Sequence, residues 1–391
     1  MYRVRTYNQI APRGLERFPE EGFEVGPDLA DAQAILLRSH KLTAAEVAPG
    51  VHAVARAGAG VNNVPVDLCT ERGVVVFNTP GANANSVKEL TLAALLLASR
   101  DVMGGMQYAK TLSNVTDEQE LHQLVEGEKK RFKGRELFGR TLGVVGLGAI
   151  GSRVARSGLD LGMRVVGYDP ALSIDGAWRL PAEVERMDDL PSLFARSDYV
   201  TLHVPSLPET QGMIDGKALG AFQPGAALLN FARQEIVDEG AVLDALRSGQ
   251  LGAYFSDFPN AALAAHKRAF ATPHLGASTQ EAEENCAVMA AEQLTDFLRF
   301  GNIENSVNFP AVNLERTEGY RIAVTNWNVA GTLGQVLSVL ADADINVIDM
   351  LNKSRDDVAY NLIDLEVEPT EALTGRIEAI DSVIGVRRFD D

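Results

Sequence analysis

The sequence predicts an α/β protein with two doubly wound parallel sheets and a small C-terminal module of the βαββαβ type. Three observations predict this fold. Short β-rich runs alternate with helical stretches in two separate regions, a glycine-rich turn joins a strand to a helix near Gly146, and the region after Arg321 has a strand and helix order of its own. With 391 residues, 46% of them hydrophobic, the chain is long enough for two or three domains with separate cores.

The first alternation occupies roughly the first ninety residues. Its β-rich runs are 3–7, 34–38, 51–56 and 74–78, with polar or helical stretches between them. Such spacing favours a parallel sheet with crossover helices. Ser86 and Glu89 then have the spacing of a capping box, which predicts a helix start before the apolar run 90–98. The polar segment 101–140 is interpreted as helix and surface connection.

The second alternation predicts strands at 141–145, 164–169, 199–204, 226–231 and 252–255. A helix is expected at 238–248, with Gly249 as its stop signal. The periodic stretch 278–299 predicts a long helix that returns to the first domain, and 302–318 is interpreted as a linker. Strands at 321–325, 346–351, 360–367 and 383–389, with helices at 332–341 and 371–380, complete a ferredoxin-like order.

These elements predict four segments. Residues 1–89 form the first part of one α/β domain, 90–276 a second doubly wound domain, 277–312 the return segment and linker, and 313–391 a C-terminal module.

Charge and cysteine content limit the possible partners. The formal net charge of −17 repels phosphate backbones, so nucleic acid is not an expected partner. The apolar run 90–98 is too short to span a bilayer, and no signal peptide is recognised at the amino terminus. The two cysteines, Cys69 and Cys286, form no CxxC or cluster with histidine, so no metal site is expected. A soluble cytoplasmic protein is the simplest interpretation.

The strongest motif is Gly146-Leu147-Gly148-Ala149-Ile150-Gly151, between the predicted strand 141–145 and a helix. In a dinucleotide site, Gly146 permits a tight turn, Gly148 lets the backbone approach a pyrophosphate, and Gly151 allows close helix packing. Asp169 ends the next predicted strand, where a carboxylate accepts from ribose hydroxyls and repels a 2′-phosphate, so NAD is favoured over NADP. The alternative is a turn that serves packing alone.

Three further segments follow predicted strands: one at His203, one ending in Arg233 and one containing His274. Oxidation of a 2-hydroxy acid needs a cation for the carboxylate and a base for the hydroxyl proton. Arg233 can grip a carboxylate through two parallel hydrogen bonds, and histidines such as His274 commonly act as general bases. Taken alone, Arg233 could be a surface ion-pair residue and His274 an ordinary loop histidine.

The GLGAIG turn, His203-Val204-Pro205, Asn230-Phe231-Ala232-Arg233 and Pro273-His274-Leu275-Gly276-Ala277 resemble segments of the D-isomer-specific 2-hydroxyacid dehydrogenases. The resemblance covers essentially the whole chain. It implies that residues 1–89 and 277–312 belong to a substrate domain, that 90–276 form a Rossmann domain that binds NAD, and that the site lies between the two. The resemblance further implies that Arg233 is the substrate-binding residue and His274 the acid/base, and that 313–391 form a regulatory module. It also implies that NAD is lined by Thr79, Gly146, Gly148, Ala149, Ile150, Gly151, Asp169, His203, Val204, Phe231, Ala232, Ser256, Gly276 and Ala277.

The sequence departs from this family in one place. The family usually has an aspartate followed by a catalytic glutamate that is paired with the histidine. Here Ser256 stands at the aspartate position and Ala261 at the glutamate position, and Asp257 is a possible replacement.

Arg38 and Ser39 end one predicted strand, and Arg56, Ala57 and Gly58 end another. Two guanidinium groups beside a glycine-rich turn suit a ligand with a carboxylate and a phosphate. Ordinary surface charge beside a packing turn is the alternative. Together with Asn83, these segments resemble the short D-3-phosphoglycerate dehydrogenases in particular, which implies oxidation of 3-phospho-D-glycerate to 3-phosphohydroxypyruvate, the first step of serine biosynthesis.

The C-terminal module resembles an ACT domain, which implies that an amino acid such as serine binds at Asn328 and Asn346 in a homodimer or homotetramer. A module that only dimerises the chain is the alternative. Two other functions stay open. One is a dehydrogenase of another D-2-hydroxy acid, such as lactate, glyoxylate or hydroxypyruvate, and the other is a non-catalytic NAD-sensing interaction protein.

Overall fold

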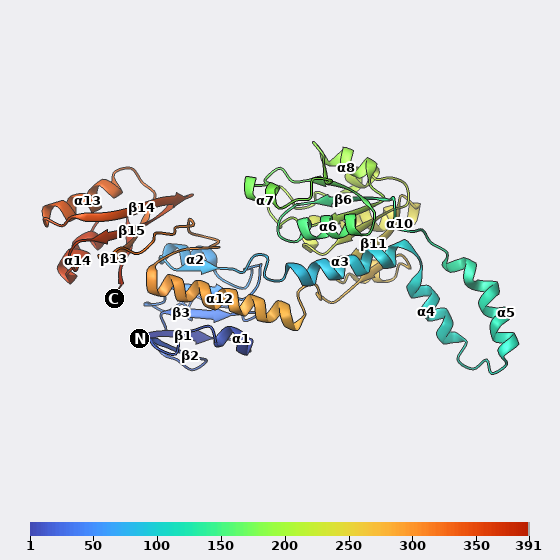
Figure 1. Cartoon of the computed structure of the whole chain (residues 1–391), viewed down its shortest axis with the longest axis horizontal. Helices are drawn as coiled ribbons and strands as arrows, with labels where there is room; N and C mark the ends of the chain where they lie inside the picture. Colours follow the sequence, from blue (N-terminus) through green and yellow to red (C-terminus); the bar gives the residue numbers. More distant parts are fainter. Residues whose placement is uncertain (390–391) are drawn as a thin grey trace. The chain divides into compact units, whose positions relative to one another are not determined.

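The computed structural model describes residues 1–389 and separates into two compact units. Unit 1 combines Met1–Asn83 with the chain from Gln280 onward, and unit 2 is Ala84–Thr279. The elements are labelled in Figure 1. The expected division into four segments, with boundaries at 89/90, 276/277 and 312/313, stays a prediction. No helix within the described residues is long and apolar enough to cross a membrane.

Unit 1 contains a five-stranded parallel sheet in the order β2-β1-β3-β4-β5. Its strands are β1 (Tyr2–Thr6), β2 (Phe23–Gly26), β3 (Ala34–Leu37), β4 (Ala53–Arg56) and β5 (Val75–Phe77). This is the 2-1-3-4-5 order of doubly wound folds. The sequence predicted four of these strands but missed β2, a four-residue edge strand.

Three helices accompany this sheet: α1 (Pro12–Leu15), α2 (Val66–Glu71) and α12 (Gln280–Phe300). The predicted long helix at 278–299 is confirmed as α12, which buries Ala290, Leu294 and Phe297 in the same hydrophobic core as Val4 and Phe77. The hydrophobic core of the N-terminal sheet is therefore completed by a helix some two hundred residues further along the chain.

Unit 2 contains a seven-stranded parallel sheet in the order β12-β11-β10-β9-β6-β7-β8. Its strands are β6 (Thr141–Val145), β7 (Arg164–Tyr168), β8 (Glu185–Arg186), β9 (Tyr199–Leu202), β10 (Ala226–Asn230), β11 (Leu251–Ser256) and β12 (Ala269–Ala271). Counted within the unit, this is the 3-2-1-4-5-6 Rossmann order with one strand added. The five predicted strands are confirmed, while the short edge strands β8 and β12 were missed.

The helices of unit 2 outside residues 102–132 are α3 (Ala84–Ser99), α6 (Gly151–Asp160), α7 (Ile174–Trp178), α8 (Leu190–Arg196), α9 (Gly216–Gly220), η2 (Gln234–Ile236), α10 (Glu239–Ser248) and α11 (Ala261–Ala264). The helix predicted at 238–248 and its stop signal at Gly249 are confirmed in α10. Asp238 accepts a hydrogen bond from Ala241 N, and Gly249 ends the helix with a φ of 82°.

The predicted capping box at Ser86 is wrong. Helix α3 begins at Ala84, so Ser86 already lies inside the first turn. Its hydroxyl donates to the carbonyl oxygen of Gly276 at 2.7 Å, and Glu89 accepts from the side chain of Asn85 at 2.7 Å. A tertiary partner from a distant loop replaces the local bond, which the S-x-x-E spacing cannot reveal.

Residues 102–132 form α4 (Val102–Thr111), α5 (Glu118–Glu128) and η1 (Lys129–Phe132). The prediction of helix and surface connection is confirmed here, since none of the residues in these three helices is buried.

The C-terminal module has the predicted βαββαβ order. It consists of β13 (Tyr320–Trp327), α13 (Thr332–Asp342), β14 (Val347–Arg355), β15 (Val358–Leu365), α14 (Glu371–Glu378) and β16 (Val383–Phe389). The antiparallel sheet has the order β14-β15-β13-β16, and β14 is an edge strand.

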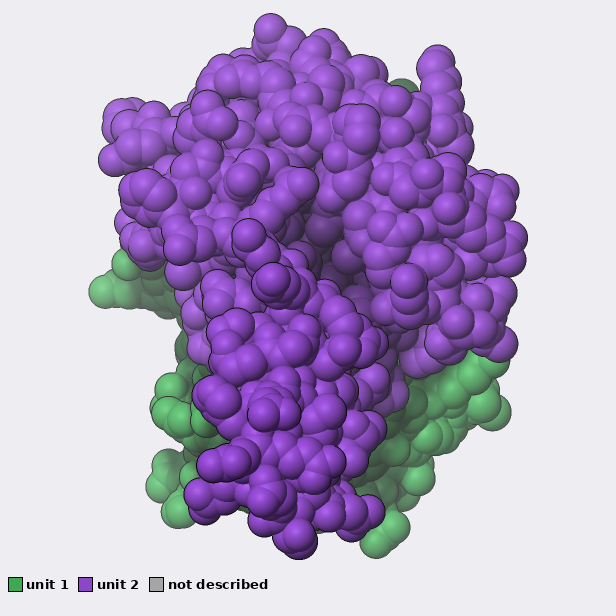
Figure 2. All heavy atoms as spheres, turned by 90° about the vertical axis from the view of Figure 1, so that its right-hand side faces the viewer, with its two compact units in different colours: residues 1–83, 280–391 green, residues 84–279 purple. Residues whose placement is uncertain are grey.

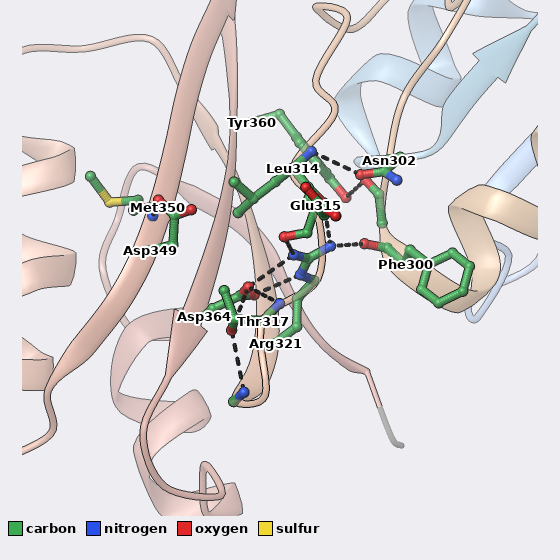
Figure 3. Close-up of polar contacts among 12 residues, drawn as sticks. Phe300, Asn302, Leu314, Glu315, Thr317, Arg321, Asp349, Met350, Tyr360 and Asp364 are labelled. Atoms are coloured by element: carbon green, nitrogen blue, oxygen red, sulfur yellow. Dashed lines mark hydrogen bonds and ion pairs between the residues drawn. The ribbon is translucent and has the colours of Figure 1, made fainter.

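Residues 302–318 are more than the linker that the sequence predicted. Phe309 is fully buried, and the side chain of Asn308 accepts from Val76 N and donates to Val74 O, both at 2.9 Å. Further along, Arg321 of β13 donates to Phe300 O and Leu314 O (Figure 3). The module is thus tied to the rest of unit 1 by side chains, because hydrogen bonds to the main chain replace regular secondary structure in this segment.

Candidate functional site

The glycine turn lies between β6 and α6. Gly146 has a φ of 88°, and a Cβ added there would lie 2.6 Å from the carbonyl oxygen of His203, so only glycine fits. A Cβ on Gly151 would lie 1.9 Å from Gly146 O, whereas nothing lies within 4 Å of a Cβ on Gly148. The two outer glycines therefore close the turn, and the middle one leaves its backbone open to a ligand at the start of α6.

Asp169 follows β7 and is half-buried beside this turn. One carboxylate oxygen accepts from Leu147 N at 2.8 Å, and the other accepts from Ala171 N at 3.0 Å. The carboxylate thus holds the glycine turn and keeps further lone pairs for other donors, because an ionised carboxylate can accept about four hydrogen bonds.

His203 follows β9, the strand next to β6 on the other side. Its Nε2 lies 2.9 Å from the hydroxyl of Thr201, while its Nδ1 is buried and has no hydrogen-bond partner among the described residues. Burial lowers the pKa of His203 to about 3, so the ring is neutral at physiological pH. A buried ring nitrogen without a partner is available to a ligand that carries a polar group.

The loop after β10 places Arg233. Asn230 is fully buried, donates through its side chain to Arg233 O at 2.8 Å and accepts from Ala232 N at 3.2 Å. The guanidinium of Arg233 donates to Ala232 O at 2.6 Å. One donor of Arg233 therefore holds the side chain to its own loop, and a guanidinium has four others for a substrate.

The loop after β12 carries His274 and is held by Asp257. The carboxylate of this buried aspartate accepts from the hydroxyl of Thr272 at 2.6 Å, from Leu275 N at 2.7 Å and from Gly276 N at 2.7 Å. Its carbonyl oxygen also accepts from His274 N at 3.0 Å. Asp257 thus holds the backbone of the loop on both sides of His274. His274 itself has a φ of 57° and an exposed side chain.

This arrangement bears on the missing glutamate. The carboxylate of Asp257 is occupied by the loop, and the ring of His274 meets Phe258 edge-on at 5.4 Å. Ala261, at the position where the family has its glutamate, is the exposed first residue of α11. Asn260 before it caps this helix and donates to Glu239 at 2.6 Å.

A second group of predicted residues lies in unit 1. Arg56 donates through Nε to Arg38 O at 3.1 Å, and Arg38 pairs with Glu283 of α12 at 2.7 Å. The guanidinium of Arg56 covers Gly58 so closely that a Cβ there would lie 2.1 Å from Nη1. The two arginines are therefore neighbours at the carboxyl ends of β3 and β4.

Two polar residues, Thr79 and Asn83, belong to the same group of predicted residues in unit 1. Thr79 is fully buried and donates through its main-chain N to Gly58 O at 3.1 Å. The side-chain oxygen of Asn83 is buried without a hydrogen-bond partner among the described residues. Burial raises the pKa of the neighbouring Cys286 thiol, which keeps it protonated and unreactive at neutral pH.

The predicted site residues thus fall into three groups. Those brought together at the carboxyl ends of the strands of unit 2 are Gly146, Gly148, Ala149, Ile150, Gly151, Asp169, His203, Val204, Phe231, Ala232, Arg233, Ser256, His274, Gly276 and Ala277. Those in the N-terminal part of unit 1 are Arg38, Ser39, Arg56, Ala57, Gly58, Thr79 and Asn83. Asn328 and Asn346 lie apart in the C-terminal module, where Asn328 donates to Asp356 O at 3.1 Å and Asn346 is exposed.

Comparison with known proteins agrees with this geometry. The family model "D-isomer specific 2-hydroxyacid dehydrogenase, NAD binding domain" matches residues 102–276. The structure of the TT0316 protein from Thermus thermophilus is 31% identical with a TM-score of 0.63, and the match covers 78% of this chain and 99% of that one. The chain belongs to the D-isomer-specific 2-hydroxyacid dehydrogenase family.

Two other relatives carry a more specific name. A D-3-phosphoglycerate dehydrogenase from Methanocaldococcus jannaschii is 33% identical over 332 residues, or 83% of this chain. The NAD+-bound 3-phosphoglycerate dehydrogenase of Entamoeba histolytica is 26% identical with a TM-score of 0.62, over 78% of this chain and 98% of that one. The chain spans only 54% to 60% of the length of the first curated relatives.

Sequence reasoning named Asn230 within the Arg233 segment and Asp257 as a candidate replacement for the family's glutamate, but it did not predict that such residues hold the loops of the site. Asn230, Asp257 and Thr201 contact backbone or a ring within the site. Their sequence positions carry no distinctive spacing, since a polar residue at a strand end can face a loop or the solvent. Asn260 is different, because an asparagine before a short apolar stretch is a recognisable helix cap.

Proposed function

We propose that this protein is an NAD-dependent D-3-phosphoglycerate dehydrogenase that oxidises 3-phospho-D-glycerate to 3-phosphohydroxypyruvate. The observation that carries the proposal is the placement of Arg233 and His274. Both lie on loops at the carboxyl ends of strands in the parallel sheet that also bears the glycine turn. Ligands of open α/β sheets bind at this end.

The glycine turn fits a dinucleotide. Its middle glycine is open, its outer glycines admit no side chain, and the start of α6 offers free backbone N–H groups to a pyrophosphate. Asp169 would hold the ribose hydroxyls, and the neighbouring residues named above would line the cofactor. NAD would supply the acceptor for the hydride that leaves C2 of the substrate.

The residues of the chain then have distinct tasks. Arg233 binds the substrate carboxylate and polarises the C2 oxygen, because its guanidinium keeps free donors that a carboxylate can pair with. His274 takes the proton of the C2 hydroxyl as the C–H bond breaks, and its exposed ring is accessible to do so. Asp257 positions His274 through the backbone. In the reverse direction His274 returns the proton.

The group around Arg38 and Arg56 would take the phosphate. Two neighbouring guanidinium groups supply the charge, and the main chain at Ala57 and Gly58 with Ser39 and Asn83 supplies polar contacts. The substrate must overcome a net charge of −17 on the whole chain, so a local cation pair is required for an anion with both a carboxylate and a phosphate.

The C-terminal module supports a regulatory proposal. Its βαββαβ order is that of an ACT domain, and Asn328 and Asn346 are the positions that would hold serine or another amino acid. We place the protein in the cytoplasm as a homo-oligomer in serine biosynthesis. A rise in the concentration of half-inhibition by serine on Asn346→Ala would support the effector site, and no inhibition of the unaltered enzyme by serine would reject it.

Steady-state rates on a panel of substrates test the main proposal. We expect the highest kcat/KM for 3-phospho-D-glycerate, lower values for D-lactate and D-glycerate, and reduced rates with NADP because Asp169 repels a 2′-phosphate. A higher kcat/KM for an unphosphorylated 2-hydroxy acid would make this another dehydrogenase of the family. NAD binding without turnover on any member of the panel would favour the NAD-sensing function, for which the alanine at position 261 is the motivating observation.

A further inference from the structure

One of the two arginines at the carboxyl ends of β3 and β4 is already paired with an anion of the protein itself. Nη1 of Arg38 lies 2.7 Å from Oε2 of Glu283, a residue in the first turn of α12. Both side chains are partly exposed, at 35% for Arg38 and 39% for Glu283. A ligand that approaches Arg38 from the solvent therefore meets a guanidinium that already carries a carboxylate.

Glu283 is held in place by the helix that carries it. Helix α12 lies along the N-terminal sheet (Figure 1), and its next residues bury Cys286 and Ala287 in the core of that sheet. A carboxylate in the first turn of a helix is also stabilised by the positive end of the helix dipole. Arg38, Arg56 and Glu283 all belong to unit 1, the green unit of Figure 2, so the pair is a feature of that unit alone.

Arg56 supplies a second cation beside this pair. Its Nε donates to the main-chain oxygen of Arg38 at 3.1 Å, since β3 and β4 are adjacent strands. The thiol of Cys286 lies within electrostatic reach of all three charged groups. Burial raises its pKa, the charges of Arg56 and Arg38 lower it, and that of Glu283 raises it further. Two positive charges and one negative charge thus share a small region of unit 1.

A phosphate and the carboxylate of Glu283 are competing ligands of Arg38. Guanidinium groups bind carboxylates and phosphates through the same kind of parallel hydrogen bonds. A phosphate monoester has a charge of about −1.5 to −2 near pH 7, which is more than the charge of a carboxylate. A partly exposed ion pair is also weak. A phosphate can therefore displace Glu283 from Arg38, whereas an uncharged hydroxyl group cannot.

We propose that Glu283 is a specificity-determining residue, which occupies Arg38 until the phosphate of the substrate displaces it. The inference rests on the proposed function, because it assumes that this phosphate binds at Arg38 and Arg56. A 2-hydroxy acid without a phosphate leaves the pair of Arg38 and Glu283 intact and gains no contact with Arg38. A phosphorylated acid gains that contact and loses only the weak pair, so the enzyme discriminates between the two. When the phosphorylated product leaves, Glu283 pairs with Arg38 again.

The test compares the Glu283→Gln variant with the unaltered full chain. Glutamine keeps the size of the side chain and an oxygen that can accept from Arg38, so the substitution removes the charge alone. We expect kcat/KM for 3-phospho-D-glycerate to rise about three- to tenfold, because the phosphate no longer has to displace a carboxylate. The kcat/KM for D-glycerate should change much less. Damage to the site could not produce a selective gain of this kind.

Inorganic phosphate provides a second readout that does not depend on turnover. Its dissociation constant, measured by calorimetric titration of the full chain, should be lower in Glu283→Gln by about the same factor. Glu281→Gln is the matched control, because Glu281 is an exposed carboxylate in the same turn of α12. It removes the same charge from the chain without touching the pair, and it should leave both the kcat/KM values and the dissociation constant close to those of the unaltered protein.

The outcomes distinguish failure of this inference from failure of the proposed function. If the unaltered enzyme has no higher kcat/KM for 3-phospho-D-glycerate than for D-glycerate, the proposed function is rejected, and the phosphate titrations still decide on Glu283. If it prefers the phosphorylated substrate, an unchanged or lower kcat/KM of Glu283→Gln for that substrate would overturn the inference, because the carboxylate would then only orient Arg38. An unchanged dissociation constant for phosphate, or an equal gain in Glu281→Gln, would overturn it as well.

Discussion

Arg321 and Asp364 form a two-pronged ion pair with both side chains buried (Figure 3). The Nε of Arg321 donates to one oxygen of Asp364 at 2.6 Å, and Nη2 donates to the other at 2.9 Å. The remaining N–H groups of Arg321 donate to the carbonyl oxygens of Phe300, Leu314 and Glu315, each at 3.0 Å. Every donor of this buried guanidinium is therefore used, which joins the C-terminal sheet to the end of α12.

Replacement of Arg321 should strongly destabilise unit 1. Arg321→Met leaves the carboxylate of Asp364 and three carbonyl oxygens unpaired, and removal of one partner of a buried pair commonly costs about 3 to 5 kcal/mol. The measurement is the free energy of unfolding in urea. Arg388→Met, at an exposed pair with Glu371, is the control and should cost about 1 kcal/mol or less. Equal losses for the two variants would contradict the assigned role of Arg321.

Asp257 should act on turnover through the position of His274. The asparagine of Asp257→Asn cannot accept hydrogen bonds from all three donors of the loop. We therefore expect kcat/KM for 3-phospho-D-glycerate to fall roughly tenfold to a hundredfold, which corresponds to a loss of about 1.5 to 3 kcal/mol in transition-state stabilisation. The acidic limb of the kcat/KM profile should keep its midpoint, because the carboxylate contacts the loop and not the imidazole. A midpoint moved to lower pH would show instead that Asp257 replaces the family's glutamate.

Gly58→Ala should imitate the loss of Arg56. The added Cβ would lie 2.1 Å from Nη1 of Arg56, the far end of a flexible side chain, so the guanidinium must move, and the φ of 158° at Gly58 adds local backbone strain. We expect Gly58→Ala and Arg56→Ala each to lower kcat/KM for the phosphorylated substrate, with a loss of about 1.5 to 3 kcal/mol in transition-state stabilisation. The kcat/KM for D-glycerate should fall much less. Gly50→Ala, at a glycine of unit 1 that also has a positive φ, 99°, but has nothing within 4 Å of an added Cβ, is the control for backbone strain. Equal effects on both substrates would reject a phosphate contact at Arg56.

Two partly buried histidines should make stability depend on pH in the mildly acidic range. Burial lowers the pKa of His203 to about 3, and burial together with the nearby Arg387 lowers that of His52 to about 4. The unfolded chain binds these protons near pH 6.5, before the folded chain does, so stability is full above about pH 6.5 and falls as the pH drops toward 4. Thermal unfolding of His52→Gln and His203→Gln between pH 7 and 4.5 should show a smaller decline. An unchanged decline in both variants would refute this.

The sequence predicted most of the regular structure because the apolar strands and their turns are local signals. The strands 141–145 and 383–389 were predicted with the observed bounds. The edge strands β2, β8 and β12 were missed, since runs of two to four residues carry little periodicity. The error at Ser86 had another origin. A hydroxyl can cap its own helix or bond a distant carbonyl, and only the tertiary structure decides between them.

The candidate site shows the same division. Glycine spacing and the order of strand, turn and helix were sufficient to predict the dinucleotide turn, because the backbone geometry itself demands those glycines. Asp257, by contrast, is assigned a role only by its contacts with Thr272, Leu275 and Gly276. Residues that act through the backbone of another loop leave no pattern in a single sequence.

The return of α12 to the first sheet has a consequence for synthesis on the ribosome. Unit 2 is one continuous stretch, so all of its contacts are available once residue 279 has emerged. The N-terminal sheet buries Val4 and Phe77 against Ala290, Leu294 and Phe309, which are translated more than two hundred residues after its first strand. The first eighty or so residues are therefore expected to stay incompletely packed while the middle of the chain folds. A nascent chain that ends between residues 84 and 279 would leave exposed the apolar face of the N-terminal sheet that α12 later covers. A chaperone that recognises apolar surface would bind at this stage of synthesis.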